Sequence, residues 1–573
     1  MKKFLLLILF LHVVHVKAQQ LQWAHNVGSV HTSSITESGF TYGICVKNDN
    51  AGNVFLSGWF GGTTDFDPSS NVYNLTPQGD FDFFIAKYDA NGAFLWAINV
   101  GGPHTEMVVN DITVDKNQNI IIAGSIYGPA TGSVTIDFDP GANTQNITTA
   151  GTDNVFLAKY NKNGNYMYAF NLYGCRQATT VSTTSDNDVV LTGKIVQSTD
   201  FDPGVNNYYV SQSGCFISKY DSVGNFKWVN QFGNYYMNGM ITATDKFDNI
   251  YAAGVYSDSL DLDPGPAIHA VSSLNKANLF MYIAKYNSSG NYIWARAISG
   301  KDTGSSASAY AIATDNNNNF YIGGPCGDSV DFSPNNYSSS YGSGGTYLAK
   351  YDSSGAFKWV FQLGDSTSVV NLHYIACNMK GKIDISGYCI GTIDFNPAPA
   401  DTNKIYATTG FDYFLAQYDT AGNYNYVLDI KQCNDAGSVA CDSSGNIWIT
   451  GGLQSNSSDF DPSSATYNLT PLGTEDAFLA KYNFANIAAI PAYNTKNSAI
   501  QIYPNPAQNN FTVEVSTNEK QILNVYDING KLVLSQTING TTNIDACNFS
   551  AGVYNISIIN SAGVTNRRLV IVK

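Results

Sequence analysis

The sequence predicts an all-β protein: a seven-bladed β-propeller closed by the N-terminal strand, followed by a small C-terminal β-sandwich. Three observations carry this prediction. One sequence unit recurs seven times, its last copy lacks a strand that the N-terminus supplies, and a different strand-rich module follows. The composition agrees, because 51 Gly, 37 Tyr and 31 Phe with 13% charged residues are typical of many short strands joined by turns.

An acidic tetrad marks each copy of the repeat. In the first copy "NVFLSG" (53–58) precedes it, "FFIAKYD" (83–89) follows it, and a glycine turn then leads into the aromatic segment "GAFLWA" (92–97). With the segment upstream, "YGICV" (42–46), each copy has four predicted strands. Four antiparallel strands repeated seven times predict a seven-bladed propeller. The first aspartates of the tetrads are Asp65, Asp137, Asp200, Asp261, Asp331, Asp394 and Asp459.

The N-terminus supplies the strand that the seventh copy lacks. After "AFLAKYN" (477–483) no aromatic segment follows, whereas "LQWAHNVG" (21–28) matches "FLWAINVG" (94–101), with Trp23 in the place of Trp96. A chain start that completes the last blade removes the two open sheet edges, which otherwise invite aggregation. The sequence therefore predicts a ring closed by the N-terminal strand.

Two families resemble parts of this chain. The "NVFLSG" and "FLAKYN…GNYMY" elements resemble the bacterial β-propeller repeat family called SBBP over about residues 21–486, which implies a propeller in an exported protein and no particular chemistry. The segments "YPNPAQNNFTV", "VYDINGKLV", "SAGVYNISI" and "RRLVIVK" resemble the type A C-terminal sorting domain of the type IX secretion system. That resemblance implies the type IX machinery as a partner.

The predicted domain order follows from these segments. An apolar run after two lysines predicts a signal peptide cut after Ala18. No other stretch is apolar enough for a predicted membrane span. The expected location is therefore secreted or at the outer cell surface. The predicted domains are the signal peptide (1–18), the propeller (19–486), a linker (487–498) and the C-terminal sorting domain (499–573).

Two roles are open for the tetrad aspartates: they cap turns, or they bind calcium. In an extended "DFDP" segment the two aspartates share one side and the phenylalanine points to the other. The first aspartate never changes, but the second becomes Ser333 and Asn396, which cap turns without a charge. We therefore expect the first aspartates to be structural and expect no cofactor. Calcium stays as the alternative, because a carboxylate pair supplies hard oxygen ligands; its candidate ligands are Asp137, Asp139, Asp200 and Asp202.

The sequence identifies no catalytic residue. "HExxH", Cys-x-x-Cys and "GxSxG" motifs are all missing. In a four-stranded meander the connections between strands two and three and between successive blades emerge on one face, so we expect a ligand to meet that loop face. Solvated loop side chains are the plainer reading of its polar residues. The candidate ligand-binding residues there are His31, Glu37, His104, Glu106, Arg176, Asp302 and His373.

The function predicted from the sequence is binding or adhesion by a secreted or surface-attached monomer, with a glycan or a protein as ligand. A net charge of −15 with four arginines argues against a nucleic acid partner. One alternative is an extracellular enzyme acting on polysaccharide, a hydrolase or a lyase, with carboxylates on the loop face. A second alternative is a structural spacer at the cell surface.

Overall fold

The computed structural model places most of the chain in short antiparallel strands. Contacts divide it into two units, Gln19–Ala485 and a second that includes Asn486–Lys573. Among the described residues, no helix is long and apolar enough to cross a membrane. The described residues are 18–29, 39–49, 51–129, 131–233, 238–272, 280–300, 306–327, 330–333, 345–365, 367–398, 403–433, 435–454, 457–485, 501–515, 520–527, 531–560 and 563–573.

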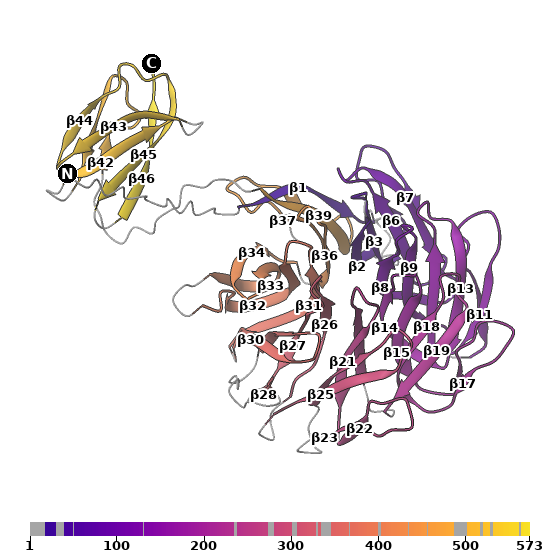
Figure 1. Ribbon diagram of the computed structural model, residues 1–573. Coiled ribbons are helices and arrows are strands. Elements are labelled where there is room, and N and C mark those ends of the chain that lie inside the picture. The colour runs from indigo at the N-terminus through magenta and orange to yellow at the C-terminus, as the bar shows by residue number, and fades with distance from the viewer. Residues whose placement is uncertain are drawn as a thin grey trace. The chain divides into compact units, whose positions relative to one another are not determined.

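The larger unit consists of consecutive four-stranded antiparallel groups (Figure 1). The first three groups are β2 (Phe40–Asn48), β3 (Val54–Gly61), β6 (Asp82–Tyr88) and β7 (Phe94–Val100); β8 (Glu106–Val114), β9 (Ile120–Tyr127), β12 (Asn154–Tyr160) and β13 (Tyr166–Tyr173); and β14 (Cys175–Thr183), β15 (Val189–Ile195), β18 (Gly214–Tyr220) and β19 (Phe226–Phe232).

The remaining groups repeat this order of strands. They are β20 (Asn238–Thr244), β21 (Ile250–Tyr256), β24 (Phe280–Tyr286) and β25 (Tyr292–Gly300); β26 (Ala311–Thr314), β27 (Phe320–Cys326), β29 (Gly345–Tyr351) and β30 (Phe357–Leu363); β31 (Val369–Cys377), β32 (Lys382–Asp394), β33 (Lys404–Asp419) and β34 (Tyr424–Ile430); and β35 (Asp435–Cys441), β36 (Asn446–Gln454) and β39 (Glu475–Ala485), with β1 (Ala18–Val27) paired to β39.

Short strands carry the tetrads between the second and third strands of the groups. Five such pairs form two-stranded sheets of their own, and β28 pairs with the end of β25. These strands are β4 (Thr64–Asp65), β5 (Asn74–Leu75), β10 (Ser133–Asp137), β11 (Asn146–Ala150), β16 (Thr199–Asp200), β17 (Tyr209–Val210), β22 (Ser259–Asp261), β23 (Ala270–Ser272), β28 (Val330–Asp331), β37 (Ser458–Asp459) and β38 (Asn468–Leu469).

The first strand of each group contacts the first strand of the next group. The contacts run from β2 through β8, β14, β20, β26 and β31 to β35, and β35 in turn contacts β2. One parallel bridge, Phe40 to Glu475, also joins the first and last groups in one sheet. The seven inner strands therefore follow one another in a cycle of contacts, whose centre we call the axis.

A buried lysine in the third strand links six of the seven groups to the next. Lys159, for example, pairs with Asp115 of its own group at 2.9 Å and donates to the carbonyl oxygen of Ser222 in the next group at 3.0 Å. Desolvating an ammonium is costly, so both partners are needed to hold it there. The equivalent bonds to the next group start at Lys87, Lys219, Lys285, Lys350 and Lys481.

The N-terminal strand makes the contacts of a fourth strand. Lys481 of the last group donates to the carbonyl oxygen of Ala90 in the first group at 2.8 Å, and Trp23 of β1 donates to the same oxygen at 3.2 Å. Trp96 Nε1 likewise donates to the next group, at Lys162. A Cβ on Gly92, whose φ is +84°, would lie 2.8 Å from the Trp23 ring, so this turn needs glycine. Figure 1 shows β1 beside β39.

The C-terminal unit has two sheets that share one core. The apolar side chains of that core come from both sheets, and they include Phe511, Val525 and Ile556. The strands are β40 (Gln501–Tyr503), β41 (Asn510–Glu514) and β44 (Thr542–Asp545) in one sheet, and β43 (Leu532–Ile538), β42 (Gln521–Tyr526), β45 (Gly552–Asn560) and β46 (Gly563–Ile571) in the other.

Candidate functional site

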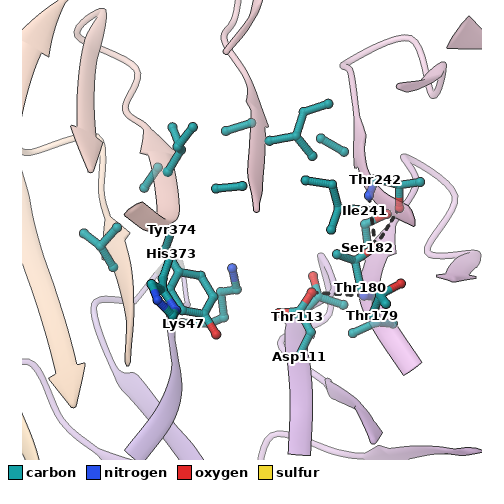
Figure 2. Close-up of a pocket in the computed structure, with 18 of the residues that line it drawn as sticks. Lys47, Asp111, Thr113, Thr179, Thr180, Ser182, Ile241, Thr242, His373 and Tyr374 are labelled. Carbon is teal, nitrogen blue, oxygen red and sulfur yellow. Dashed lines mark hydrogen bonds between the residues drawn. The ribbon is translucent and has the colours of Figure 1, made fainter. Parts of the chain in front are cut away.

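A cavity of about 620 Å³ lies between the inner strands, and every one of the seven contributes to its lining. We call it the axial cavity. Its wall combines hydroxyl, aromatic and charged side chains with alanines. Figure 2 shows Lys47, His373 and Tyr374 on one side and Thr179, Thr180, Ser182 and Thr242 on the other.

A capped turn after each inner strand makes the seven strands directly comparable. The Oδ1 atom of Asp115, for example, accepts the N–H groups of Asn117 and Asn119, both at 2.9 Å. Such a side chain satisfies backbone donors that the ladder leaves unpaired. Counting back from this capping residue assigns each inner-strand position to a level. The capping residues are Asp49, Asp115, Thr184, Asp245, Asp315, Asn378 and Asp442.

Two residues before the cap, all seven side chains line the axial cavity. We call this set the axial level. Three neighbouring strands, β2, β8 and β14, provide a lysine and two hydroxyls, and the other four strands provide alanine. The axial level comprises Lys47, Thr113, Ser182, Ala243, Ala313, Ala376 and Ala440.

Side chains four residues before the cap form hydrogen bonds to the backbone of neighbouring inner strands. Thr180 Oγ1 accepts the N–H of Thr242 at 3.1 Å, and Ser438 Oγ accepts the N–H of Val46 at 2.5 Å. The second of these bonds joins the last group to the first. Hydrogen bonds of this kind satisfy backbone groups that face the axis, where no further strand can pair with them.

Asp111 is the acidic member of that level. Its Oδ1 accepts the N–H of Ile112 at 2.9 Å and its Oδ2 accepts the N–H of Val181 at 3.0 Å. Burial raises the pKa of this carboxyl, and the charge of Lys47 and the two N–H groups offset part of that rise. The carboxyl is therefore held in place by backbone donors, with no ion pair within 4 Å among the described residues.

Tyr374 reaches from β31 toward β2 along one side of the axial cavity. Burial raises the pKa of its hydroxyl, and the neighbouring Cys45 thiol and the charge of Asp111 raise it further. Because β35 lies between β31 and β2 in the cycle of contacts, the Tyr374 side chain passes β35 to reach β2. His373, beside it in sequence, packs against Tyr310 and Tyr388 with ring centroids 6.3 and 5.3 Å away.

A second cavity of about 420 Å³ adjoins the axial cavity at the turns. Both are lined by Asn48 and Thr244, so the second cavity forms the turn-side approach to the first. Lys116 and Lys246 stand on its wall, and each donates to a carbonyl of the next group, at Ser185 and Asn316 respectively, at 2.8 Å. The sequence prediction considered only the opposite, loop face.

The sixth group departs from the pattern of buried third-strand lysines. Gln417 stands in the place of the third-strand lysine, and its Nε2 donates to Oδ1 of the fully buried Asp384 at 2.7 Å. Tyr426 donates to the same oxygen at 3.3 Å. Burial raises the pKa of Asp384 to about 7. The equivalent second-strand residues in the other groups are Phe55, Ile121, Val190, Tyr251, Tyr321 and Trp448.

The tetrad aspartates cap their own loops. Asp137 Oδ1 accepts the N–H of Asp139 at 3.0 Å and that of Gln145 at 2.7 Å. Asp139 Oδ1 accepts the N–H of Gly141 at 2.8 Å. The same capping of the residue two positions on is made by Asp65, Asp200, Asp261, Asp331, Asp394 and Asp459.

The apolar residue of each tetrad is completely buried and anchors the loop. A tyrosine of the third strand donates to its carbonyl oxygen in all seven repeats, as Tyr160 does to Phe138 at 3.0 Å. Among the described residues, no three His, Cys, Asp or Glu side chains are grouped to hold a metal ion. The anchored residues are Phe66, Phe138, Phe201, Leu262, Phe332, Phe395 and Phe460.

Of the loop residues predicted to bind ligand, His373 is the one that lines the axial cavity. His104 is exposed in a turn with φ +56°, and Glu106 is half-buried at the start of β8. Arg176 is half-exposed and its Nε donates to Asp153 Oδ1 at 2.6 Å. The predicted candidates His31, Glu37 and Asp302 lie outside the described residues.

Sequence reasoning missed Lys47, Thr113, Ser182, Asp111 and Tyr374. The signal that could have found the first three was present, since aligning the seven capped turns and reading two residues back gives alanine in four copies and a polar residue in three. The nine cysteines form no disulfide, and six of them are buried among apolar side chains.

Comparison with known proteins identifies the C-terminal unit. A family model described as a secretion system C-terminal sorting domain matches residues 501–572. The chain is therefore a protein exported by the type IX secretion system, to the cell surface or into the medium, and this unit is the part that meets the machinery.

The larger unit resembles other proteins at low sequence identity. An uncharacterized WD repeat-containing protein of Acanthamoeba polyphaga mimivirus is 23% identical over 513 residues, which cover 75% of this chain and 36% of the viral protein. A protein of unknown function from Dyadobacter fermentans covers 81% of this chain and 99% of its own at 9% identity and a TM-score of 0.34. An ulvan lyase of polysaccharide lyase family PL25 covers 73% of this chain and 92% of its own at 10% identity and a TM-score of 0.34. Likenesses of this size assign no activity.

Proposed function

We propose that this chain is an exported, monomeric glycan-binding protein and that the axial cavity holds part of the glycan. The axial cavity is the observation that carries the proposal. Its volume of about 620 Å³ lies in the range of roughly 300–1,000 Å³ typical of ligand sites. Hydroxyl, ammonium and aromatic side chains set among alanines suit a ligand that carries hydroxyls on a compact ring.

The proposal also specifies the architecture of the larger unit. The seven groups are the blades of an SBBP-like propeller, with β1 as the fourth strand of the last blade. The paired donors Trp23 and Lys481 on the carbonyl of Ala90 support this closure, and so does the bond from Val46 to Ser438. Removal of residues 1–18 as a signal peptide leaves Gln19 at the head of β1.

The test is a binding screen with a cavity-filling control. The exported protein is titrated calorimetrically with a panel of neutral, uronic-acid and sulfated oligosaccharides, and the titrations are repeated with Ala313→Leu. Ala313 lies on β26, across the ring from β2, and is half-buried. We expect at least one oligosaccharide to bind and the variant, with an unchanged melting temperature, to lose that binding. A protein that binds no member of the panel contradicts the proposal and favours a structural spacer.

Catalysis on the same glycan is the second candidate. Asp111, His373 and Tyr374 are side chains able to exchange protons, and they share one cavity with the ammonium of Lys47. General acid–base chemistry needs such groups within reach of one substrate. Release of new reducing ends during the same screen would favour a hydrolase or a lyase over a binding protein.

A further inference from the structure

Three polar side chains of the axial level lie on three consecutive inner strands. Lys47, Thr113 and Ser182 occupy equivalent positions on β2, β8 and β14, and these strands contact one another in that order. The remaining four positions are alanines. The axial level therefore has a polar arc that faces an apolar wall.

The ammonium of Lys47 has no anionic partner within 4 Å among the described residues. Lys159 and Lys219, which are also withdrawn from solvent, pair with Asp115 and Asp188 at 2.9 and 3.1 Å. Lys47 is half-buried on the cavity wall, and its charge lowers the pKa of Asp111. An ammonium that is partly removed from solvent and has no carboxylate within ion-pair distance is unfavourable. The position of Lys47 therefore suits an anion that arrives from outside.

The Ser182 hydroxyl is a second indication of a ligand at this level. Its Oγ is buried and has no hydrogen-bond partner in the part of the chain that the structure describes. The nearby Thr179 and Thr180 differ, because their hydroxyls bond to Thr192 at 2.7 Å. A buried hydroxyl left unsatisfied costs free energy that a ligand oxygen would recover.

The alanine wall gives the ligand a second contact. Ala243, Ala313, Ala376 and Ala440 leave room opposite the polar arc, where larger side chains would fill the axis. Methyl groups suit the C–H face of a sugar ring and offer nothing to its hydroxyls. The axial level thus presents polar groups to one side of a ligand and methyl groups to the other.

We propose that Lys47, Thr113 and Ser182 bind a singly charged anionic group, a carboxylate or a sulfate, on a sugar unit whose apolar face rests on the alanine wall. This inference rests on the proposed function, because it names the class of glycan that the axial cavity takes. Lys47 supplies the charge, and the two hydroxyls donate to the oxygens of the same group. The ligand reaches the level through the adjoining cavity at the turns, past Lys116 and Lys246.

The experiment compares matched probes on the unmodified protein. A uronic-acid oligosaccharide, its carboxyl-reduced neutral counterpart and a sulfated oligosaccharide of equal length are titrated calorimetrically at fixed salt. We expect one of the two anionic probes to bind at least about tenfold more tightly than the neutral probe, since a charged hydrogen bond contributes roughly that much or more. The anionic probe that binds more tightly identifies the group as carboxylate or sulfate.

Variants then locate the anion. Lys47→Met keeps the side-chain length and removes the charge, and we expect the affinity for the anionic probe to fall about tenfold to a hundredfold while that for the neutral probe stays unchanged. Lys162→Met is the matched control, because it removes one charge from an exposed turn outside the cavity. It should leave both affinities unchanged.

The outcomes separate this inference from the proposed function. Equal affinity for anionic and neutral probes, with binding lost in Ala313→Leu, overturns the anionic site and leaves glycan binding in the axial cavity intact. Anion preference that survives Lys47→Met places the anion elsewhere and also overturns the inference. Binding that survives Ala313→Leu contradicts the proposed function and this inference together. Absence of all binding does the same.

Discussion

The tetrad loops and the axial level both occur seven times, and they differ in what the seven copies keep. Every tetrad keeps its first aspartate, which caps the loop, and its buried apolar residue, which anchors it. The axial level keeps alanine in four copies and departs from it at Lys47, Thr113 and Ser182. The repeated residues stabilise each four-stranded group, and the positions that depart from the repeat provide polar side chains on three neighbouring inner strands. Changes at repeated positions should therefore alter stability, and changes at unrepeated positions should alter binding.

The largest effect is expected from removing a repeated element altogether. Deleting Gln19–Gly28 removes β1, whose Trp23, Ala24 and Val27 are buried. We expect a loss of about 5 kcal/mol or more, since burying one large side chain contributes roughly 1.5–3 kcal/mol and the seam hydrogen bonds are lost as well. Thermal denaturation followed by calorimetry checks this. An unchanged melting temperature and unchanged cooperativity would refute the closed ring.

The next effect concerns Asp384, in the group that has Gln417 in place of the buried third-strand lysine. The pKa of Asp384 rises to about 7 in the folded protein, well above the usual range of an aspartate, so its contribution to stability is present at low pH and is lost as pH rises through about 7. The expected loss between pH 5 and 8 is on the order of a few kcal/mol, at about 1.4 kcal/mol per pKa unit.

Asp384→Asn is the matched variant for that pH dependence. It keeps the acceptor for Gln417 and Tyr426 and removes the titration. We expect it to be more stable than the wild type above pH 7 and to lose the slope, as measured by urea unfolding at a series of pH values. Identical pH profiles for the two proteins would show that Asp384 is not the titrating group.

A smaller effect is expected at the tetrads. Asp137→Ala removes two charge-assisted bonds to backbone N–H groups, which we expect to destabilise the protein by about 2–3 kcal/mol. Asp139→Asn keeps an acceptor for Gly141 and should change stability by less than about 0.5 kcal/mol. A chelator should leave both melting curves in place. A large drop in melting temperature on chelation would instead make the tetrads calcium sites.

The repeated features were predictable from the sequence because each is written several times in one chain. The match of "LQWAHNVG" (21–28) to "FLWAINVG" (94–101) indicated the pairing of β1 with β39, since strands of equal pattern occupy equal places in a repeat. The substitution of Ser333 and Asn396 for aspartate indicated turn capping, because those side chains accept the same N–H groups. The seven copies within one chain show which residues are kept and which vary.

The axial cavity was harder to predict because its lining is distributed over the whole larger unit. Lys47 and Ser182 are far apart in sequence and come together only when the inner strands surround one axis. In the sequence Tyr374 is one more aromatic residue of a strand, and only the structure shows that it lines the cavity and reaches Cys45 of β2. The loop histidines attracted the prediction instead, since they are rare residues in long connections, yet of those that the structure describes His373 alone lines the cavity.

The central claim is that departures from the repeat mark a ligand site on the axis. The most direct measurement is a crystal structure of the exported protein soaked with the anionic oligosaccharide that binds most tightly. The account predicts density for a sugar unit in the axial cavity, with its anionic group at the ammonium of Lys47 and the hydroxyl of Ser182. Density on the loop face, with the axial level unchanged and occupied by water alone, would contradict it.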